Sequence, residues 1–530
     1  MRVLITDALS AASTDLLDAA GIGYDTRLKL DEDALAEVVG GYDGWLIRSG
    51  TQVTARLLEK ADTLKVVGRA GVGVDNVDLE AATRRGVLVV NAPDGNTIST
   101  AEHTCAMALA LMRRIPQANA SLRGGSWERK AFSGSELDGK VLGVVGVGKI
   151  GRAVAHRLAS FGMTVLGFDP VLTKEAGEKM GITLVGLDRI WAEADLITVH
   201  TPLNDATRGL LDRETLAKCK PGVRIVNCAR GGIVDEEALL EALESGHVGG
   251  AALDVFSEEP PETEVLRRLI AHPDVVATPH IAASTEEAQE KVGRQVTEQL
   301  VRALRGEPVT TPVNAGAIRM AAQPEARPYL DLARRLGAIA AQLAGDGSLR
   351  RVTVGCYGEP ARRYAEVLTV GALTGVLGRW ADVPVNLVNA GALARELGLH
   401  VEEQRHSDAA GYANLVEVCL ETTTGERSVK GTVLGSQGEA RLVGLDHFRF
   451  EVKPEGHLLF YQNVDRPGML ATVGQLLADA GTNIASLTLG RTAPGEVALT
   501  VIAADAAVPP ATLRAVRAVE GVDQVYAVSI

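Results

Sequence analysis

The chain has 530 residues, 46% of them hydrophobic, and carries a formal net charge of −13. This length predicts roughly three or four domains with sizeable cores, and the acidic balance without any basic run argues against nucleic-acid partners. Five cysteines without C-x-x-C spacing predict buried thiols in a reducing compartment, with neither disulfides nor a metal site. No apolar run approaches membrane-spanning length and the N-terminus lacks the apolar core of a signal peptide, so we expect a soluble, cytoplasmic protein without a membrane partner.

Residues 1–96 alternate short β-type runs with helical stretches, and this alternation predicts a parallel sheet with crossover helices. From Asn96, a residue type common at helix caps, the chain enters an apolar helix around Ala101–Arg113 and then a polar connection. A second α/β unit is expected over 97–286. The amphipathic stretch Glu286–Arg305 is placed to carry the chain back onto the first unit, which predicts a discontinuous first domain of 1–96 plus 287–312.

The second unit opens with an apolar strand that runs into glycines spaced G-x-G-x-x-G and then into a helix. Gly146 allows a sharp turn, Gly148 removes a Cβ that would hold a pyrophosphate away, and Gly151 lets helix and strand approach. The pattern predicts a dinucleotide site with phosphate at the helix N-terminus. Asp169 ends the next strand, about 20 residues past the glycines, where a carboxylate hydrogen-bonds a ribose 2′-OH and repels a 2′-phosphate. We therefore expect NAD as the cofactor, rather than NADP.

After residue 312 the pattern changes. A helix over Pro328–Leu343, mixed helices and a β-rich region over Asn414–Val452 predict a separate domain at 313–453. Residues 454–530 have the βαββαβ order of a ferredoxin-like domain. The expected fold class is α/β, with two Rossmann-like, doubly wound domains followed by an α+β domain and a ferredoxin-like domain.

Three later segments of the second unit carry side chains suited to oxidising a secondary alcohol. That reaction needs a group that accepts the hydroxyl proton and a cation that holds the substrate while its carbonyl develops. Arg230 lies beside two glycines at the carboxyl end of a strand, and the segments Asp254–Pro260 and Ala277–Ala283 each follow another strand. Ligands of open α/β sheets bind at this edge, so we expect the three segments to converge on one crevice.

On these residues, and on Arg69–Asn76, the chain resembles the NAD-dependent D-2-hydroxyacid dehydrogenases and, within them, the long form that oxidises 3-phosphoglycerate. The resemblance implies that His280 accepts the C2 hydroxyl proton and that Glu259 orients the imidazole and stabilises its charged form. It also implies that Arg230 clamps the substrate carboxylate. Glu258 stays open as an alternative partner of His280, because spacing alone does not separate the two carboxylates.

The same resemblance implies the other contacts in the crevice. Besides the glycines and Asp169, the implied cofactor contacts are Lys149, Ile150, Thr201, Cys228, Ala229, Arg230 and Asp254. Arginine forks suit phosphate, and small residues leave backbone N–H groups available. The expected substrate contacts are therefore Arg48, Ser49, Gly50, Arg69 and Asn96, with Arg230 and His280. Capping of a strand or helix end is the alternative for Thr201, Asp254 and Asn96. Arg129 and Lys130 are expected either to reach a neighbouring subunit or to form a solvated turn.

The terminal domain resembles an ACT domain, a module that binds small amino acids between paired copies. Asn463, Asp465 and Asn483 are the residues that this resemblance assigns to an effector, expected to be L-serine. Some serine-sensitive relatives carry His or Tyr near Asn463, and helix initiation by Pro467 is the alternative explanation of the motif. The resemblance further implies a homotetramer.

Two other functions stay open. One is a dehydrogenase or reductase of the same family that acts on another D-2-hydroxy acid, such as 2-hydroxyglutarate. The other is a non-catalytic NAD-sensing protein with the same fold. The set of Arg230, Glu259 and His280, together with an effector domain, favours an enzyme that opens the phosphorylated route to L-serine.

Overall fold

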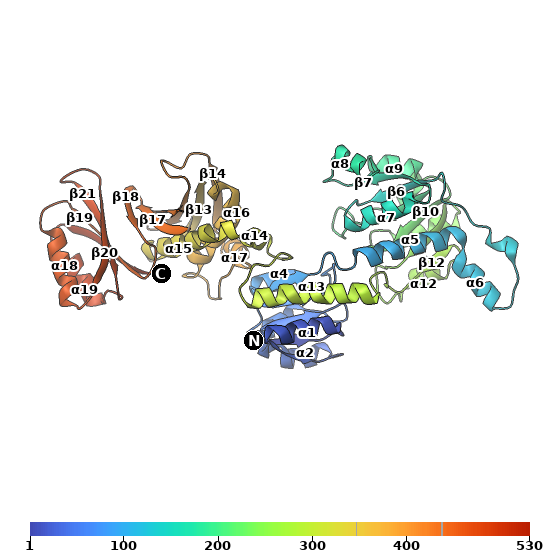
Figure 1. Ribbon diagram of the computed structural model, residues 1–530, viewed down its shortest axis with the longest axis horizontal. Helices are drawn as coiled ribbons and strands as arrows, with labels where there is room; N and C mark the ends of the chain where they lie inside the picture. The colour runs from blue at the N-terminus through green and yellow to red at the C-terminus, as the bar shows by residue number, and fades with distance from the viewer. Residues whose placement is uncertain (346, 436–437) are drawn as a thin grey trace.

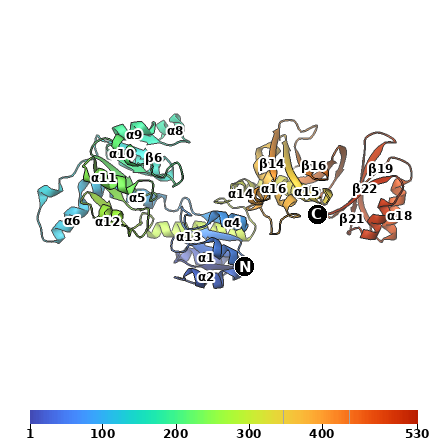
Figure 2. The same ribbon diagram turned by 180° about the vertical axis from the view of Figure 1, so that it is seen from behind.

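A computed structural model describes residues 1–345, 347–435 and 438–530. Within these residues the chain forms four sheets, which lie along an elongated molecule (Figure 1). The first sheet lies near the middle, the second at one end, and the third and fourth lead to the other end. The view from behind shows the same order (Figure 2).

The first sheet contains five parallel strands in the order β2-β1-β3-β4-β5. The strands are β1 (Arg2–Ile5), β2 (Gly23–Thr26), β3 (Gly44–Ile47), β4 (Val66–Arg69) and β5 (Leu88–Asn91). The helices between them are α1 (Ala11–Ala20), α2 (Glu32–Val38), α3 (Ala55–Lys60) and α4 (Leu79–Arg84). Strand β3 is buried throughout because the sheet is covered on both faces, which explains its continuous apolar run.

Helix α13 (Glu286–Leu304) follows the second sheet in the chain but packs on the first. Its residues Val296 and Leu300 are fully buried in one core with Leu46 of β3. Glycine at position 68 makes this approach possible, since a Cβ there would lie 3.1 Å from Val296. The amphipathic stretch therefore returns to the first sheet, while the individual domain boundaries stay predictions.

The second sheet contains seven parallel strands in the order β12-β11-β10-β9-β6-β7-β8. The strands are β6 (Val141–Val145), β7 (Thr164–Phe168), β8 (Thr183–Leu184), β9 (Leu196–Val199), β10 (Val223–Asn227), β11 (Val248–Leu253) and β12 (Val275–Ala277). Its helices are α5 (Thr97–Arg113), α6 (Ile115–Arg123), α7 (Lys149–Ala159), α8 (Lys174–Lys179), α9 (Leu187–Glu193), α10 (Arg213–Lys218), α11 (Glu236–Glu244) and α12 (Glu264–Ala271). The strand order reverses between β6 and β9, which opens a crevice at the carboxyl edge of the sheet.

The third sheet is mixed, in the order β14-β13-β15-β16-β17-β18. The strands are β13 (Leu349–Tyr357), β14 (His400–His406), β15 (Leu415–Thr422), β16 (Gly425–Leu434), β17 (Glu439–Leu445) and β18 (Phe448–Val452). The helices of this region are α14 (Gly316–Ala321), α15 (Arg327–Leu343), α16 (Ala365–Leu377) and α17 (Ala390–Glu396). Among the strands that the structure describes in this sheet, β13 and β14 alone pair in parallel.

The fourth sheet is antiparallel, in the order β20-β21-β19-β22. The elements are β19 (His457–Val464), α18 (Met469–Asp479), β20 (Ile484–Arg491), β21 (Val497–Ala504), α19 (Pro510–Arg517) and β22 (Val522–Ser529). Alternate residues of β19 serve two cores. Leu459 and Tyr461 pack under the two helices, whereas Leu458 and Phe460 join the core of the third sheet. The predicted βαββαβ domain is therefore attached through one face of its sheet.

The predicted fold class is confirmed, and three elements differ from the sequence-based expectation. Helix α6 occupies part of the predicted polar connection after Arg113. None of its residues is buried, and its large apolar side chains Ile115 and Leu122 are exposed. Strands β13 and β14 lie where mixed helices were expected. The charged, largely exposed sequence of β14, an edge strand, hides its β pattern.

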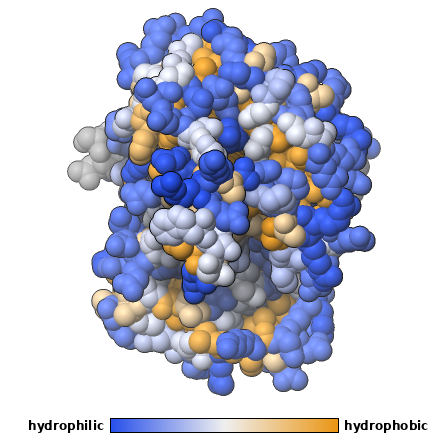
Figure 3. Space-filling model, turned by 90° about the vertical axis from the view of Figure 1, so that its right-hand side faces the viewer, coloured by the Kyte–Doolittle hydropathy of each residue, from blue (hydrophilic) through white to orange (hydrophobic). Residues whose placement is uncertain are grey.

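None of the helices formed by the described residues is long and apolar enough to cross a membrane. The face at the end of the molecule that carries the second sheet is mainly hydrophilic, with apolar side chains in small separate groups (Figure 3).

Candidate active site

The glycine-rich turn between β6 and α7 is held by close backbone contacts. Gly146 has a φ of +91°, and Gly151 lies so close to it that a Cβ at 151 would sit 2.0 Å from the Gly146 carbonyl oxygen. A Cβ at Gly148, by contrast, would point into space with no protein atom within 4 Å. Gly148 is also the N-cap of α7, so unpaired N–H groups of the helix start at this turn.

Asp169 closes the other side of the turn. Its carboxylate accepts hydrogen bonds from the backbone N–H groups of Val147 and Val171, each at 3.0 Å. The predicted ribose contact therefore lies beside the glycine turn, and the carboxylate helps to hold it. Free space at Gly148 and a carboxylate at the end of β7 fit an NAD dinucleotide.

A cavity of about 420 Å³ continues from this turn toward the first sheet. The predicted site residues that line it are Asn96, Ile150, Thr201, Cys228, Ala229, Arg230 and His280. Within the part of the chain that the structure describes, the side-chain oxygens of Asn96 and Thr201 are buried without a hydrogen-bond partner. Asn96 makes no side-chain bond to the start of α5, so capping does not explain it. Two such orphaned oxygens fit a cavity that receives a polar ligand.

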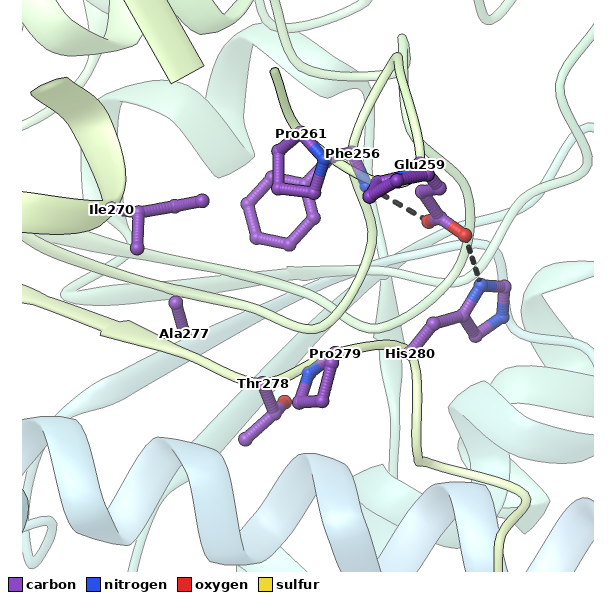
Figure 4. A pocket seen from close by; sticks show the side chains of 9 residues that line it. Phe256, Glu259, Pro261, Ile270, Ala277, Thr278, Pro279 and His280 are labelled. Carbon is purple, nitrogen blue, oxygen red and sulfur yellow. Dashed lines mark hydrogen bonds and ion pairs between the residues drawn. The ribbon is translucent and has the colours of Figure 1, made fainter. Parts of the chain in front are cut away.

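His280 lines this cavity and forms a direct pair with Glu259. Figure 4 shows the pair in a neighbouring pocket, which both residues line. The Nδ1 atom of His280 lies 2.7 Å from Oε2 of Glu259, whose other oxygen accepts the backbone N–H of Phe256 at 3.1 Å. Burial alone would raise the pKa of Glu259, but the bonds from His280 and Phe256 outweigh it and the pKa is lowered. His280 adopts a φ of +52°, a costly conformation for a residue with a Cβ. Glu259, and not Glu258, is thus the carboxylate in contact with the imidazole.

Asp254 anchors the loop that carries His280. It is fully buried, and its oxygens accept the Thr278 hydroxyl at 2.6 Å and the N–H groups of Ile281 and Ala282 at 2.9 Å. Nε2 of His103 on α5 adds a contact at 3.3 Å. Burial raises the pKa of Asp254, but these bonds outweigh it and the pKa is lowered. The carboxylate therefore stabilises the strained loop, while its predicted contact with the cofactor stays a prediction.

Arg230 reaches from the end of β10 across the crevice to the first sheet. Its Nε lies 3.0 Å from Oδ2 of Asp75, and its Nη1 donates to the Ala229 carbonyl at 2.7 Å. The Asn227 side chain binds the backbone carbonyl of Arg230 at 2.9 Å and so holds the turn. Gly231 is required there, because a Cβ would lie 1.8 Å from the Phe256 carbonyl oxygen.

Two further arginines lie at the carboxyl edge of the first sheet. Burial lowers the pKa of Arg69 to about 10, and the charge of nearby Arg230 contributes to this shift. Among the described residues, the Nε atom of Arg69 is buried and has no hydrogen-bond partner. The backbone N–H groups of Arg48 and Thr51 both donate to Asp7, which leaves Ser49 and Gly50 exposed at the loop tip. This crowding of cations favours an anion.

Lys149 and His200 complete the cofactor side. Lys149 forms an ion pair with Asp94, in the connection between β5 and α5. His200 lines the cavity, and burial lowers its pKa to about 4, so its imidazole is neutral near pH 7. Arg129 and Lys130 are exposed on a short turn of helix after α6 and do not line this cavity.

Sequence reasoning missed Asp7, Asp75 and His103. Asp7 lies two residues after the end of β1, the neighbour of β3, so its place at the same sheet edge as Arg48 was open to prediction. Asp75 lies in the family-like segment that was singled out, but its partner is 155 positions away. His103 sits within an apolar helix, and nothing in its local pattern marks a contact with Asp254.

The three predicted effector residues are not together in one chain. Asn463 pairs opposite Ala498 of β21, whereas Asn483 directly precedes Ile484, which pairs opposite Ala504 at the other end of that strand. At about 3.3 Å per residue the two ends are about 20 Å apart. Asp465 lies near Asn463 and pairs with Arg491 at 3.1 Å. A site built from all three residues therefore requires two copies of the chain.

The arrangement combines a dinucleotide turn, an imidazole with an oriented carboxylate partner, and guanidinium groups that face one crevice. An imidazole that donates through Nδ1 to a carboxylate keeps its Nε2 lone pair for a substrate proton. Guanidinium groups beside it bind the carboxylate of a small acid and stabilise charge on a developing carbonyl. These groups are the ones that oxidation of a 2-hydroxy acid requires.

Three family models match the chain. The NAD binding domain of the D-isomer specific 2-hydroxyacid dehydrogenases matches residues 105–282. The intervening domain of D-3-phosphoglycerate dehydrogenase matches residues 325–446, and the ACT domain matches residues 457–521. The first match covers the glycine turn, Arg230, Glu259 and His280.

Whole-chain comparisons agree with these matches. The D-3-phosphoglycerate dehydrogenase of Bacillus subtilis is 46% identical over 467 residues, which cover 88% of this chain and 87% of that protein. The enzyme of the same name from Synechocystis is 41% identical over 530 residues, which cover 100% of this chain and 95% of that protein. Among solved structures, a protein of Thermus thermophilus is similar with a TM-score of 0.55 and 36% identity, over 59% of this chain and 100% of that one.

Proposed function

Because the chain belongs to the D-3-phosphoglycerate dehydrogenase family of NAD-dependent oxidoreductases, we propose that it oxidises the C2 hydroxyl of D-3-phosphoglycerate to 3-phosphohydroxypyruvate. The observation that carries this proposal is the 2.7 Å contact between His280 and Glu259 at a cavity also lined by Arg230. The reaction would be the first step of the phosphorylated route to L-serine.

His280 is the proton acceptor in this proposal. Its Nδ1 is bonded to Glu259, so the Nε2 atom takes the proton from the C2 hydroxyl. Glu259, with a lowered pKa, stays ionised and stabilises the imidazolium that forms. In the reverse direction the same imidazolium returns the proton to the carbonyl oxygen.

The guanidinium groups account for the two anionic ends of the substrate. Arg230, held by Asn227 at the end of β10, binds the carboxylate next to C2. Arg69 and Arg48, with the exposed backbone of Ser49 and Gly50, bind the phosphate at the edge of the first sheet. Burial of Arg69 supports this assignment, because a phosphate beside it offsets the cost of a desolvated cation.

On the cofactor side, NAD supplies the acceptor for the hydride that leaves C2. Gly148 leaves room for its pyrophosphate at the start of α7, next to Lys149 and Ile150. Asp169 meets the adenosine ribose, and the neighbouring cavity wall at Thr201, Cys228 and Ala229 holds the nicotinamide end.

Regulation and assembly are part of the proposal. The ACT match supports L-serine as an effector bound between two copies by Asn463 and Asp465 of one copy and Asn483 of the other. We place a homotetramer in the cytoplasm and assign the first domain to 1–96 plus 287–312, the NAD domain to 97–286, the intervening domain to 313–453 and the ACT domain to 454–530.

The direct test is NADH formation by the purified chain with D-3-phosphoglycerate, D-glycerate and D-2-hydroxyglutarate as alternative substrates. The proposal expects the largest kcat/KM for phosphoglycerate and rejects the phosphate assignment if D-glycerate performs equally well. Glu259→Gln should lower kcat by about 10- to 100-fold. Glu258→Gln, the matched control one position earlier, should leave kcat unchanged because that carboxylate does not contact His280.

The effector is tested separately by calorimetry with L-serine. Heat of binding is expected for the wild-type chain. It should be lost in Asp465→Ala, because we propose that this carboxylate binds the positively charged amino group of L-serine. No heat with the wild-type chain rejects the effector assignment and leaves the catalytic one intact.

A further inference from the structure

Two cations assigned to ligand binding already have carboxylate partners on the opposite wall of the crevice. Arg230, at the end of β10, pairs with Asp75 in the loop after β4 at 3.0 Å. Lys149, at the start of α7, pairs with Asp94 in the connection after β5. In both pairs the cation belongs to the second sheet and the carboxylate to the first sheet or its exit.

The local backbone is shaped around the pair of Arg230 and Asp75. A Cβ at Gly73 would lie 1.9 Å from Nη2 of Arg230 and 2.7 Å from Oδ2 of Asp75. Any side chain at position 73 would therefore displace the ion pair. The guanidinium uses Nε for Asp75 and one hydrogen of Nη1 for the Ala229 carbonyl, so Asp75 occupies one of the two edges on which a carboxylate can bind with two prongs.

Asp75 and Asp94 differ from the other carboxylates of the crevice. Asp7, Asp169 and Asp254 each accept hydrogen bonds from backbone N–H groups and thereby hold loops in place. Across residues 1–345, 347–435 and 438–530, the carboxylates of Asp75 and Asp94 accept hydrogen bonds from their cations alone. These two carboxylates can therefore separate from their cations without leaving a backbone N–H group that lacks a hydrogen-bond acceptor.

The carboxylates of both pairs are open to solvent. The side chains of Asp75 and Asp94 are 70% and 53% exposed, whereas those of Arg230 and Lys149 are 29% and 55% exposed. Solvent-exposed ion pairs contribute little to stability, so an incoming anion exchanges with them at low cost. A carboxylate left beside a bound anion would also repel it.

We infer that Asp75 and Asp94 are stand-in carboxylates: Asp75 holds Arg230 where the substrate carboxylate binds, and Asp94 holds Lys149 where a cofactor phosphate binds. This inference rests on the proposed function, since it takes the two ligand anions from it. Each ligand displaces one aspartate, so Asp75 lowers the apparent affinity for substrate and Asp94 lowers that for NAD.

The test uses the full chain with Asp75→Asn and Asp94→Asn, which keep the side-chain shape and remove the charge. At low salt, Asp94→Asn should tighten NADH binding, measured by calorimetry, by about threefold or more, with no change in KM for phosphoglycerate. Asp75→Asn should lower that KM by about threefold or more, with NADH binding unchanged. Both differences should shrink as salt is added. Asp75→Ser, which also loses the charge, repeats the substrate arm with a smaller side chain.

The matched control is Asp62→Asn, which removes the partner of Arg85 at the opposite edge of the first sheet. It should change neither constant. Weaker or unchanged ligand binding in the two test variants would overturn the inference, because the aspartates would then orient their cations or act on neither ligand. NADH binding is measured without turnover. If the chain fails to oxidise phosphoglycerate, the proposed function is rejected, but the NADH measurement on Asp94→Asn still tests the role of Asp94.

Discussion

The cofactor half of the crevice is formed mainly by backbone groups, whereas the substrate half is formed mainly by side chains. The cofactor half consists of backbone: a glycine turn with a φ of +91°, a helix start and one carboxylate that accepts two N–H groups. The substrate half consists of long charged side chains from β4, β10 and the loop after β3, each near a carboxylate from elsewhere in the chain. The first is specified within a short stretch of sequence, and the second only after the sheets have come together.

Because of this difference, the two halves are sensitive to different substitutions. A backbone site fails when a Cβ enters it, whatever the charge of the new side chain. A side-chain site fails when a charge that contacts the ligand is removed, whatever the shape that stays behind. The predictions that follow test one half against the other.

The largest expected effect is on the proton acceptor. His280→Ala should lower kcat for phosphoglycerate oxidation by about 10²- to 10⁴-fold, because it removes the imidazole that Glu259 orients and stabilises in its charged form. NADH binding, measured by calorimetry, should change little, since the glycine turn does not contact His280. A parallel loss of NADH binding would show that the two halves are not separate.

The next largest effect separates two glycines of one turn. Gly148→Ala should fold normally, because no protein atom lies within 4 Å of the new Cβ, yet it should weaken NADH binding by about 100-fold. Gly151→Ala forces a Cβ to within 2.0 Å of a carbonyl oxygen and should lower stability by about 1–3 kcal/mol. Thermal unfolding and NADH titration of both variants distinguish these outcomes. Equal melting temperatures would contradict the geometry of the turn.

The cofactor half and the substrate half also differ in how well the sequence predicted them. The glycine turn, Asp169 and the order of the βαββαβ elements were predictable, because their signals lie in consecutive residues. The convergence of Arg230 and His280 was predictable from the strand ends, whereas their chemical roles required the resemblance. The partners Asp75, Asp94 and His103 could not be predicted, because each contact joins distant segments through one side-chain conformation.

A smaller effect is expected from the anchor of the His280 loop. Asp254→Asn replaces one carboxylate oxygen with an NH2 group that cannot accept, so at least one of the bonds from Thr278, Ile281 and Ala282 is lost. The loop then loses part of its preference for the strained conformation at His280. We expect kcat to fall by about tenfold with a modest change in KM. His103→Gln, which keeps a donor near the carboxylate, should have a weaker effect. An unchanged kcat in Asp254→Asn would reject the anchoring role.

The smallest expected effect concerns Cys228, which lines the cofactor half. Burial raises the pKa of its thiol to about 12, and the neighbouring charge of Asp254 adds to this. The thiol is therefore protonated at all pH values well below 12, and iodoacetamide at about pH 8 should not inactivate the enzyme. Mass spectrometry of the treated protein checks the residue itself. Rapid alkylation at Cys228 with loss of NADH binding would contradict the burial of this site.

The central claim is that hydrogen leaves C2 of phosphoglycerate for the nicotinamide while His280 takes the hydroxyl proton. The most direct measurement uses D-3-phosphoglycerate carrying deuterium at C2 and follows the label by mass spectrometry of the NADH formed. The account predicts that the NADH contains deuterium and that His280→Ala forms almost none of it in the same time. Deuterium released to water, or labelled NADH formed at an undiminished rate by His280→Ala, would contradict it.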